Sequence, residues 1–302
     1  MTNLTTTGTT FRAMGTEIAV RVGHETPAAL VAEVRDLFEH WEAVLSRFLP
    51  DSELSRINAA AGTTVRVSPL VHRVICEALR AARATDGVFD PALGKQLVAA
   101  GYAQSFDLPS TTQFRVSSPR PGGAWRDIEV DDAAQTIRVP RGVALDFGGI
   151  AKGMAVDAAI AVLSAGGATS ALVNAGGDMR AITAGEAGWP VGLTDAPGQF
   201  LMLVDGAVAT SSTARRRWRV GSEDQHHLLD PRTGGPSRSG VWSVSVAAAS
   251  CAHAEVAAKT ALILGPVGGA RFLERLGFAG LMSGTDGTTI RIGQWPSQEI
   301  AQ

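Results

Sequence analysis

The spacing of apolar residues along the chain alternates between a helical and an extended period. Over residues 27–45, and again over 69–85, apolar side chains recur at helical spacing, which predicts two amphipathic helices. Ser68 before Pro69 is typical of a helix start, and Asp86-Gly87 is typical of a helix end. The same pattern predicts further helices over residues 150–163, 252–264 and 267–276.

Between these helices, short segments have the pattern of β-strands. Residues 16–22 alternate between polar and apolar side chains, and residues 171–174 form a short apolar run that indicates a buried strand. Because helices and strands follow one another in mixed order, we expect an α+β fold of mixed β-sheets flanked by helices rather than a doubly wound parallel sheet. Further strands are predicted over residues 135–139, 200–210, 241–248, 279–283 and 288–292.

The chain contains no internal repeat and no clean linker, so residues 1–302 are predicted to form a single domain. With 45% apolar and 19% charged residues, this domain can bury a sizeable core. Cys76 and Cys251 lie far apart in apolar helical contexts, and we expect both to be small buried hydrophobic residues. Residues 104–128 are rich in Ser, Pro and Gly and are predicted to form a surface excursion.

Charge and the N-terminal sequence limit the classes of partner. The formal net charge of −2 argues against a nucleic-acid binder, which has to neutralise phosphates, and gives no reason to expect an anionic membrane surface. The polar N-terminus lacks a basic and an apolar signal region, and no apolar run reaches the length of a membrane span. We therefore expect a cytoplasmic protein without a membrane anchor.

The most informative stretch covers residues 146–157. It places Asp146 at a strand end, followed by the turn Gly148-Gly149 and by a helix that opens with Lys152. Glycines allow close approach of the backbone, a helix N-terminus offers unpaired N–H groups, and the lysine adds positive charge, so the stretch predicts an anion site. It matches neither the P-loop nor the dinucleotide fingerprint. A tight strand-to-helix turn with a solvated lysine would give the same pattern.

Two further stretches contain candidate site residues. His226 and His227 precede a turn, and because neighbours in a strand point to opposite sides, one of them can face a cleft. An isolated histidine is, however, more often structural or solvated. On the helix over residues 252–264, Glu255 and Lys259 share a face. They form either an exposed ion pair or a polar stripe turned toward a site.

Taken together and in this order, these residues resemble the FAD:protein FMN transferase family, the ApbE family. The resemblance covers residues 11–265, and so many motifs in one order are hard to obtain by chance. The matching motifs are Met14-Gly15-Thr16, Asp51-Ser52-Glu53-Leu54-Ser55 through Asn58, Phe89-Asp90-Pro91, residues 146–157, Asn174-Ala175-Gly176-Gly177-Asp178, Ala209-Thr210-Ser211, residues 227–234 and Ala254-Glu255.

The resemblance implies a T-fold-related architecture with a larger and a smaller lobe, and FAD in the cleft between them. It also implies Mg²⁺, held by the backbone carbonyl of Gly149 and by side chains of the late helix, here Glu255 with Lys259 at the next family position. The residues that the resemblance implies as FAD contacts are Met14, Phe48, Phe89, Asp90, Pro91, Asp146, Lys152 and His227.

The family reaction is the attack of a threonine or serine hydroxyl of a target flavoprotein on the FMN-side phosphate of FAD, which releases AMP. Pyrophosphate cleavage needs charge neutralisation at the phosphate oxygens, for which Lys152, the helix N-terminus and a cation are the candidates. Since histidine can accept a proton near neutral pH, His227 is the candidate general base. Asp146 is a candidate for hydrogen bonds to the flavin ring edge or the ribityl chain.

Two positions depart from the family pattern. The family usually has Asp and then Thr where this chain has Glu255 and Lys259, and a lysine cannot ligate Mg²⁺ because its ammonium only donates. Either the metal is held differently, or the Lys259 ammonium replaces it, or transferase activity has been lost. Phe48 replaces a more usual tyrosine, which keeps the stacking surface and removes a hydroxyl.

Two other functions would use the same residues. An FAD pyrophosphatase would replace the protein hydroxyl by water and give FMN and AMP. A non-catalytic FAD-binding protein would give neither product, and the altered pair Glu255 and Lys259 keeps this alternative open. The sequence does not separate transfer from hydrolysis, because the attacking hydroxyl belongs to the partner.

Overall fold

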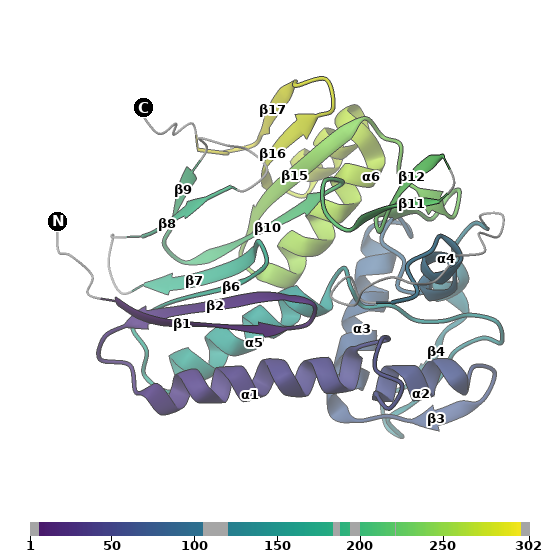
Figure 1. Cartoon of the computed structure of the whole chain (residues 1–302), viewed down its shortest axis with the longest axis horizontal. Helices are drawn as coiled ribbons and strands as arrows, with labels where there is room; N and C mark the ends of the chain where they lie inside the picture. The colour runs from purple at the N-terminus through teal and green to yellow at the C-terminus, as the bar shows by residue number, and fades with distance from the viewer. Residues whose placement is uncertain (1–5, 105–119, 184–187, 194–199, 221, 297–302) are drawn as a thin grey trace. The chain divides into compact units, whose positions relative to one another are not determined.

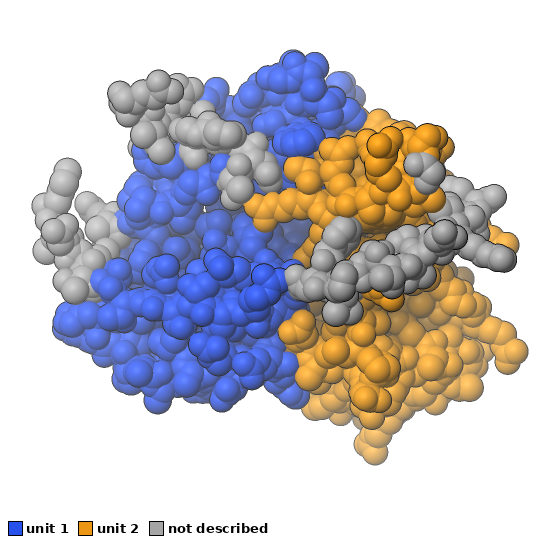
Figure 2. Space-filling view, viewed as in Figure 1, with its two compact units in different colours: residues 1–40, 152–212, 240–302 blue, residues 41–151, 213–239 orange. Residues whose placement is uncertain are grey.

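The computed structural model describes residues 6–104, 120–183, 188–193, 200–220 and 222–296. The chain divides into two compact units (Figure 2). Unit 1 consists of residues 1–40, 152–212 and 240–302, and unit 2 of residues 41–151 and 213–239. Most of the predicted excursion over residues 104–128 lies outside the described residues.

Unit 1 is built on an antiparallel β-sheet with the strand order β1-β2-β6-β7-β10-β15-β16-β17 (Figure 1). Its strands are β1 (Thr6–Ala13), β2 (Thr16–Gly23), β6 (Ser170–Ala175), β7 (Asp178–Thr183), β10 (Gly206–Ser212), β15 (Val241–Ala248), β16 (Ala279–Gly284) and β17 (Thr289–Ile292). A separate hairpin pairs β8 (Trp189–Gly192) with β9 (Phe200–Leu203).

Different elements cover the two faces of this sheet. On one face, Trp189 of the β8–β9 hairpin belongs to the same apolar cluster as Leu281 of β16. Helix α6 (Cys251–Arg275) contacts β10, β15 and β16, and its Leu273 lies against Gly280. Because neighbouring residues of a strand face opposite sides, α6 covers the other face.

Two more helices accompany the sheet of unit 1. Helix α1 (Ala28–Leu45) begins in unit 1, and its last residues belong to unit 2. Helix α5 (Ala151–Ala165) is followed by Gly166, where a Cβ atom would clash with the side chain of Leu30 in α1. The glycine therefore lets the start of α1 lie against the end of α5.

Unit 2 combines short helices with small sheets. Its largest helix, α3 (Pro69–Ala84), begins as predicted, because Oγ of Ser68 accepts a hydrogen bond from the N–H of Val71 at 3.3 Å. The remaining elements of unit 2 are α2 (Glu53–Ala59), α4 (Gly94–Ala99), a 3₁₀ turn (Ala124–Asp127), the sheet β3-β5-β4 (Thr64–Arg66, Thr136–Arg138, Glu129–Asp131), and the hairpins β11–β12 (Arg217–Val220, Glu223–His226) and β13–β14 (Leu229–Asp230, Gly235–Pro236).

The predicted α+β class is confirmed. The two helices predicted over residues 252–264 and 267–276 are both present within α6, because the backbone at Gly265 (φ 79°), just before Pro266, leaves the helical conformation between them. Among the described residues, α6 is also the one helix long and apolar enough to span a membrane, which corrects the expectation that no segment reaches this length. However, 61% of its apolar stretch is buried, as in a core helix.

Candidate functional site

In unit 1, one lysine and two carboxylates form a buried ionic cluster. Lys152 lies in the first turn of α5, Asp178 is the first residue of β7, and Glu255 lies one turn into α6. Nζ of Lys152 donates to Oε1 of Glu255 at 2.6 Å and also to Oδ2 of Asp178. The Lys152 side chain is 14% exposed and that of Glu255 is 5% exposed. The alternatives of a solvated lysine and of an exposed ion pair with Lys259 are therefore wrong.

Close packing of α5 against α6 positions Glu255. A Cβ atom on Gly153 would lie 2.7 Å from the backbone at Ala252, so this approach requires glycine. Asp157, one turn further along α5, accepts hydrogen bonds from the N–H groups of Cys251 at 2.9 Å and of Ala252 at 3.0 Å. These groups lack helical partners, because they lie in the first turn of α6. With α6 fixed in this way, Oε2 of Glu255 accepts a hydrogen bond from the N–H of Gly153 at 2.8 Å.

The end of the sheet beside this cluster carries two hairpin turns. Met14-Gly15 joins β1 to β2, and Gly176-Gly177 joins β6 to β7. Each of these residues has a positive φ, as a two-residue hairpin turn of type I′ requires. The turns are neighbours because β2 pairs with β6, and a Cβ atom on Gly176 would clash with Thr16. Met14 (φ 52°) and Asp178 therefore lie at the same end of the sheet, Met14 in a backbone conformation unfavourable for its side chain.

The charges of the Lys152 cluster do not cancel. With all groups ionised, two carboxylates face one ammonium, which leaves one negative charge in excess. Burial raises the pKa of Glu255, the neighbouring Lys152 opposes this, and Asp178 raises the pKa further. Buried carboxylate oxygens in excess of positive charge are the donors that a hard cation such as Mg²⁺ prefers. The oxygens of Asp178 and Glu255 fit such a cation, whereas the ammonium of Lys259 does not.

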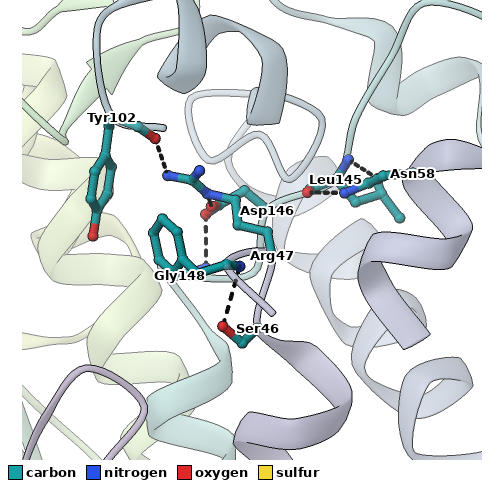
Figure 3. Close-up of polar contacts among 8 residues, drawn as sticks. Ser46, Arg47, Asn58, Tyr102, Leu145, Asp146 and Gly148 are labelled. Carbon is teal, nitrogen blue, oxygen red and sulfur yellow. Dashed lines mark hydrogen bonds and ion pairs between the residues drawn. The ribbon is translucent and has the colours of Figure 1, made fainter. Parts of the chain in front are cut away.

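In unit 2, Arg47 holds the carboxylate of Asp146 (Figure 3). Nε of Arg47 donates to Oδ2 of Asp146 at 2.6 Å, and Nη2 donates to the carbonyl of Tyr102 at 2.7 Å. Oδ1 of Asp146 accepts a hydrogen bond from the N–H of Gly148 at 2.9 Å. Oδ1 of Asn58 accepts a hydrogen bond from the N–H of Leu145 at 2.7 Å, and Nδ2 of Asn58 donates one to the carbonyl of Leu145 at 3.0 Å. The turn that contains Asp146 is thus fixed by side chains from two other segments of unit 2.

Aromatic rings surround the guanidinium group of Arg47. The ring centroid of Phe48 lies 4.2 Å from Cζ of Arg47, and that of Tyr102 lies 4.6 Å from it. The rings of Phe48 and Tyr102 are 5.4 Å apart, and Trp218 follows 5.5 Å beyond Tyr102. Nε1 of Trp218 donates to the carbonyl of Ala100 at 2.7 Å, which orients its ring. Phe48 is therefore part of an aromatic group, and its stacking on FAD stays a prediction.

The segment Phe89-Asp90-Pro91 is buried and supports the Asp146 turn. Phe89 is only 1% exposed. Oδ1 of Asp90 accepts a hydrogen bond from the N–H of Ala92 and Oδ2 one from the N–H of Gly123, both at 2.7 Å. The carbonyl of Pro91 accepts one from the N–H of Asp146 at 2.9 Å. These contacts position Asp146, and a direct FAD contact by the three side chains stays a prediction.

The two adjacent histidines have different surroundings. In His226, Nε2 lies 3.0 Å from the carbonyl of Ser237, and Nδ1 accepts a hydrogen bond from the N–H of Leu228 at 3.3 Å. This pattern fits the neutral imidazole that carries its proton on Nε2. Burial lowers the pKa of His226. His227 follows β12 directly and is half-buried, and its role as general base stays a prediction.

The sequence analysis assigned no role to four residues that hold these clusters together, namely Arg47, Tyr102, Asp157 and Asp178. Asp157 and Asp178 lie inside the quoted motifs without an assigned role, although a carboxylate directly after the Gly176-Gly177 turn was a usable signal. Arg47 directly precedes Phe48, and the sequence analysis gave it no role. No local pattern connects Arg47 with Tyr102, because 55 positions separate them.

The family profile and the curated relatives establish the class of this protein. The sequence profile of the ApbE family matches residues 14–282. This chain belongs to the ApbE family. The FAD:protein FMN transferase of Treponema pallidum (strain Nichols) is 31% identical over 286 residues, which cover 83% of this chain and 77% of the relative. The FAD:protein FMN transferase of Chlamydia trachomatis serovar D is 34% identical over 235 residues, which cover 75% of this chain and 73% of the relative.

Solved structures have the same fold. The crystal structure of the ApbE protein from Thermotoga maritima superposes with a TM-score of 0.85 at 26% sequence identity, and the match covers 95% of this chain and 97% of that one. The apo form of the flavinyl transferase ApbE from Pseudomonas stutzeri superposes with a TM-score of 0.80 at 24% identity over 95% of this chain and 94% of that one, and at this identity the match shows the fold alone. The predicted ApbE-like fold is confirmed.

Proposed function

We propose that this chain transfers the FMN half of FAD to a threonine or serine hydroxyl of a target flavoprotein and releases AMP. The observation that carries this proposal is the match to relatives named FAD:protein FMN transferase over 83% and 75% of the chain. The matched family region, residues 14–282, contains Lys152, Asp178 and Glu255. Their buried cluster supports the proposal, because pyrophosphate cleavage depends on positioned charges.

In this reaction the acceptor oxygen forms a bond to the FMN-side phosphorus, and the bond from this phosphorus to the bridging oxygen breaks. AMP leaves with the bridging oxygen, and the hydroxyl proton passes to a base, for which we propose His227. The N–H groups at the start of α5 are donors for phosphate oxygens. In unit 2, the carboxylate of Asp146 and the ring of Phe48 offer the flavin a hydrogen-bond acceptor and a stacking surface.

We propose that Asp178 and Glu255 are the side chains that hold Mg²⁺. When bound there, the ion would supply positive charge to the phosphate oxygens. Lys152 is then a positioning residue, since it holds both carboxylates through its ammonium group. A contribution from the Gly149 carbonyl stays a prediction from the resemblance, as does the cytoplasmic location.

The test is incubation of the pure protein with FAD, Mg²⁺ and a flavoprotein domain that presents a threonine acceptor. Transfer predicts that the acceptor gains the mass of one FMN and that an equal amount of AMP appears. Free FMN with AMP and an unmodified acceptor would identify a pyrophosphatase instead. Bound FAD without any AMP would identify a carrier, and either result would overturn the proposal.

The variant His227→Ala tests the base. We expect transfer to fall about 100-fold or more while FAD affinity measured by fluorescence quenching stays close to wild type. His226→Ala is the matched control, and it should transfer far better than His227→Ala. Equal activity of the two variants would remove the role of His227.

Wild type should also bind FAD more tightly than FMN, because the resemblance implies that the matched motifs contribute to both the flavin and the pyrophosphate site.

A further inference from the structure

Unit 2 contains a second group of ligand-type side chains, on α3 and on the turn between β4 and β5. His72 and Cys76 lie on α3, and Asp132 lies in the turn. Positions i and i+4 are neighbours on one side of a helix. The other side of α3 is buried in the core through an apolar row that includes Val74 and Leu79. His72 and Cys76 are therefore available to Asp132, and Cys76 is half-buried rather than part of the core, which corrects the expectation from sequence.

The distances within this group match the ligand shell of a metal ion. Sγ of Cys76 lies 3.9 Å from Nδ1 of His72 and 3.8 Å from Oδ1 of Asp132, and Nε2 of His72 lies 3.2 Å from the same oxygen. One ligand atom from each residue lies within 4.8 Å of the other two. A tetrahedral zinc ion with ordinary bond lengths separates its ligand atoms by about 3.3–3.6 Å. An imidazole binds one metal ion through one of its two nitrogens, so either Nδ1 or Nε2 of His72 would be the ligand. The 3.8 Å between Sγ of Cys76 and Oδ1 of Asp132 needs a few tenths of an ångström of adjustment to reach the tetrahedral spacing.

The imidazole of His72 gives an independent reason to place a cation here. Its Nε2 is buried and, within the part of the chain that the structure describes, forms no hydrogen bond. The nearest acceptor is the carboxylate oxygen of Asp132 at 3.2 Å. A buried ring nitrogen beside a carboxylate oxygen without a hydrogen bond is costly in either tautomer of the imidazole, because its hydrogen-bonding capacity is unused. A cation shared by the two atoms removes this cost.

We propose that His72, Cys76 and Asp132 form a zinc site. Zinc accepts nitrogen, sulfur and oxygen ligands together, whereas Mg²⁺ and Ca²⁺ prefer oxygen alone. The side chain of Asp132 is 85% exposed, so solvent can reach the site and water can complete the tetrahedron. Copper(II) and other late transition metals share some of this ligand preference.

The site has a structural role. Cys76 and Asp132 are 56 positions apart, and they belong to a helix and to a hairpin turn that a metal would tie together. Zn²⁺ that binds only the folded chain stabilises it by mass action. The group lies outside the residues proposed for FMN transfer, so its occupancy is independent of that proposal.

The test uses Co²⁺ as a spectroscopic substitute for Zn²⁺ on the full chain, because thiolate ligation gives cobalt a charge-transfer absorption. We expect one equivalent of Co²⁺ to produce this absorption and Zn²⁺ to displace it. Cys76→Ser should abolish it, and Asp132→Asn should weaken Co²⁺ binding by more than the ~10–100-fold that loss of an outer partner costs. Saturating Zn²⁺ should raise the melting temperature of wild type by about 5 °C and that of Cys76→Ser hardly at all.

Two control variants separate this site from other metal-binding groups. Cys251→Ser removes the buried second thiol and should keep the cobalt absorption. Glu77→Gln removes a neighbouring carboxylate of α3 that pairs with Arg80, and it should bind Co²⁺ as wild type does. FMN transfer by Cys76→Ser should equal that of wild type. A cobalt–thiolate absorption that survives in Cys76→Ser, or a wild-type melting temperature unchanged by Zn²⁺, would overturn the zinc site.

Discussion

The ionic clusters of the two units compensate charge in different ways. In unit 1, the ammonium of Lys152 donates to the two buried carboxylates of Asp178 and Glu255. With all three groups ionised, this cluster keeps one negative charge in excess. In unit 2, the guanidinium of Arg47 pairs with one carboxylate among the described residues, that of Asp146, and it also donates to a carbonyl and stacks on aromatic rings. The first arrangement favours an additional cation, whereas the second is complete without one.

The clusters also differ in how the chain builds them. In unit 1, the closeness of α5 and α6 depends on Gly153. In unit 2, the long side chains of Arg47 and Asn58 reach across to the Asp146 turn. A cluster that depends on close backbone contact is sensitive to small additions of volume, and one made by long side chains is sensitive to their truncation.

The largest expected effect is the loss of Lys152. Lys152→Met leaves two buried carboxylates without a counter-charge, and we expect the free energy of unfolding to fall by about 3–5 kcal/mol in urea denaturation. The matched change in unit 2, Arg47→Met, exposes a single carboxylate that is partly solvated, so its loss should be smaller. Adding Glu255→Gln to Lys152→Met should restore part of the stability. Equal losses in the two units would contradict the contrast drawn between them.

A smaller effect is expected from one added methyl group. Gly153→Ala would place Cβ 2.7 Å from the start of α6, and overpacking of this kind costs about 1–3 kcal/mol. Transfer activity should fall with it, because the displaced α6 carries Glu255 away from the N–H of Gly153. Gly192→Ala is the control, since no atom of the residues that the structure describes lies within 4 Å of the added Cβ there. If Gly153→Ala unfolds at the same urea concentration as Gly192→Ala, the helices are not held by this contact.

Sequence patterns predicted the elements with strong periodicity. The apolar spacing over residues 27–45 and 69–85 gave α1 and α3 almost to the residue, because each helix buries one clear stripe. Strand β7 was not among the predicted strands, and it follows the Gly176-Gly177 turn directly. The short helix α2 was not predicted. Ser52 caps it by accepting a hydrogen bond from the N–H of Ser55 at 3.0 Å, but seven residues carry too little periodicity to show a helix.

The candidate sites were predicted only where a motif is local. Asp146 and Lys152 became candidates because glycines and charge lie together in sequence. Their partners Arg47 and Asp178 come from distant segments, and the pairing depends on tertiary packing that no local spacing encodes. Burial of Glu255 could not be read from its helix either, because the polar pair with Lys259 looks the same on an exposed face.

The substitution at Lys259 allows a test of the negative excess in unit 1. If the Lys259 ammonium replaces the metal, FAD affinity should be the same with Mg²⁺ and with EDTA, and Lys259→Ala should weaken it by about 10-fold, near 1.4 kcal/mol. Lys259→Thr, which supplies a hydroxyl oxygen, should then make FAD binding depend on Mg²⁺. If wild type instead loses FAD on chelation and Lys259→Ala behaves identically, Asp178 and Glu255 hold a conventional metal site. Calorimetry of the three proteins, each with Mg²⁺ and with EDTA, distinguishes the two outcomes.

The smallest expected effect lies in unit 2 and concerns the pH dependence of stability. Burial lowers the pKa of His226 below its usual value of 6.5, so the unfolded chain binds a proton more readily than the folded one. The contribution of His226 to stability is therefore complete above pH 6.5 and is lost as the pH falls from 6.5 through the folded pKa. His226→Gln should show a shallower loss of stability over this range, because an amide does not titrate. Urea denaturation of both proteins from pH 7.5 to about pH 5 measures the difference. The comparison tests the burial of the imidazole, because burial is the main cause of the lowered pKa of His226, whereas the hydrogen bond to the carbonyl of Ser237 raises this pKa. Parallel pH profiles of wild type and variant would mean that burial at this position does not disfavour the protonated ring.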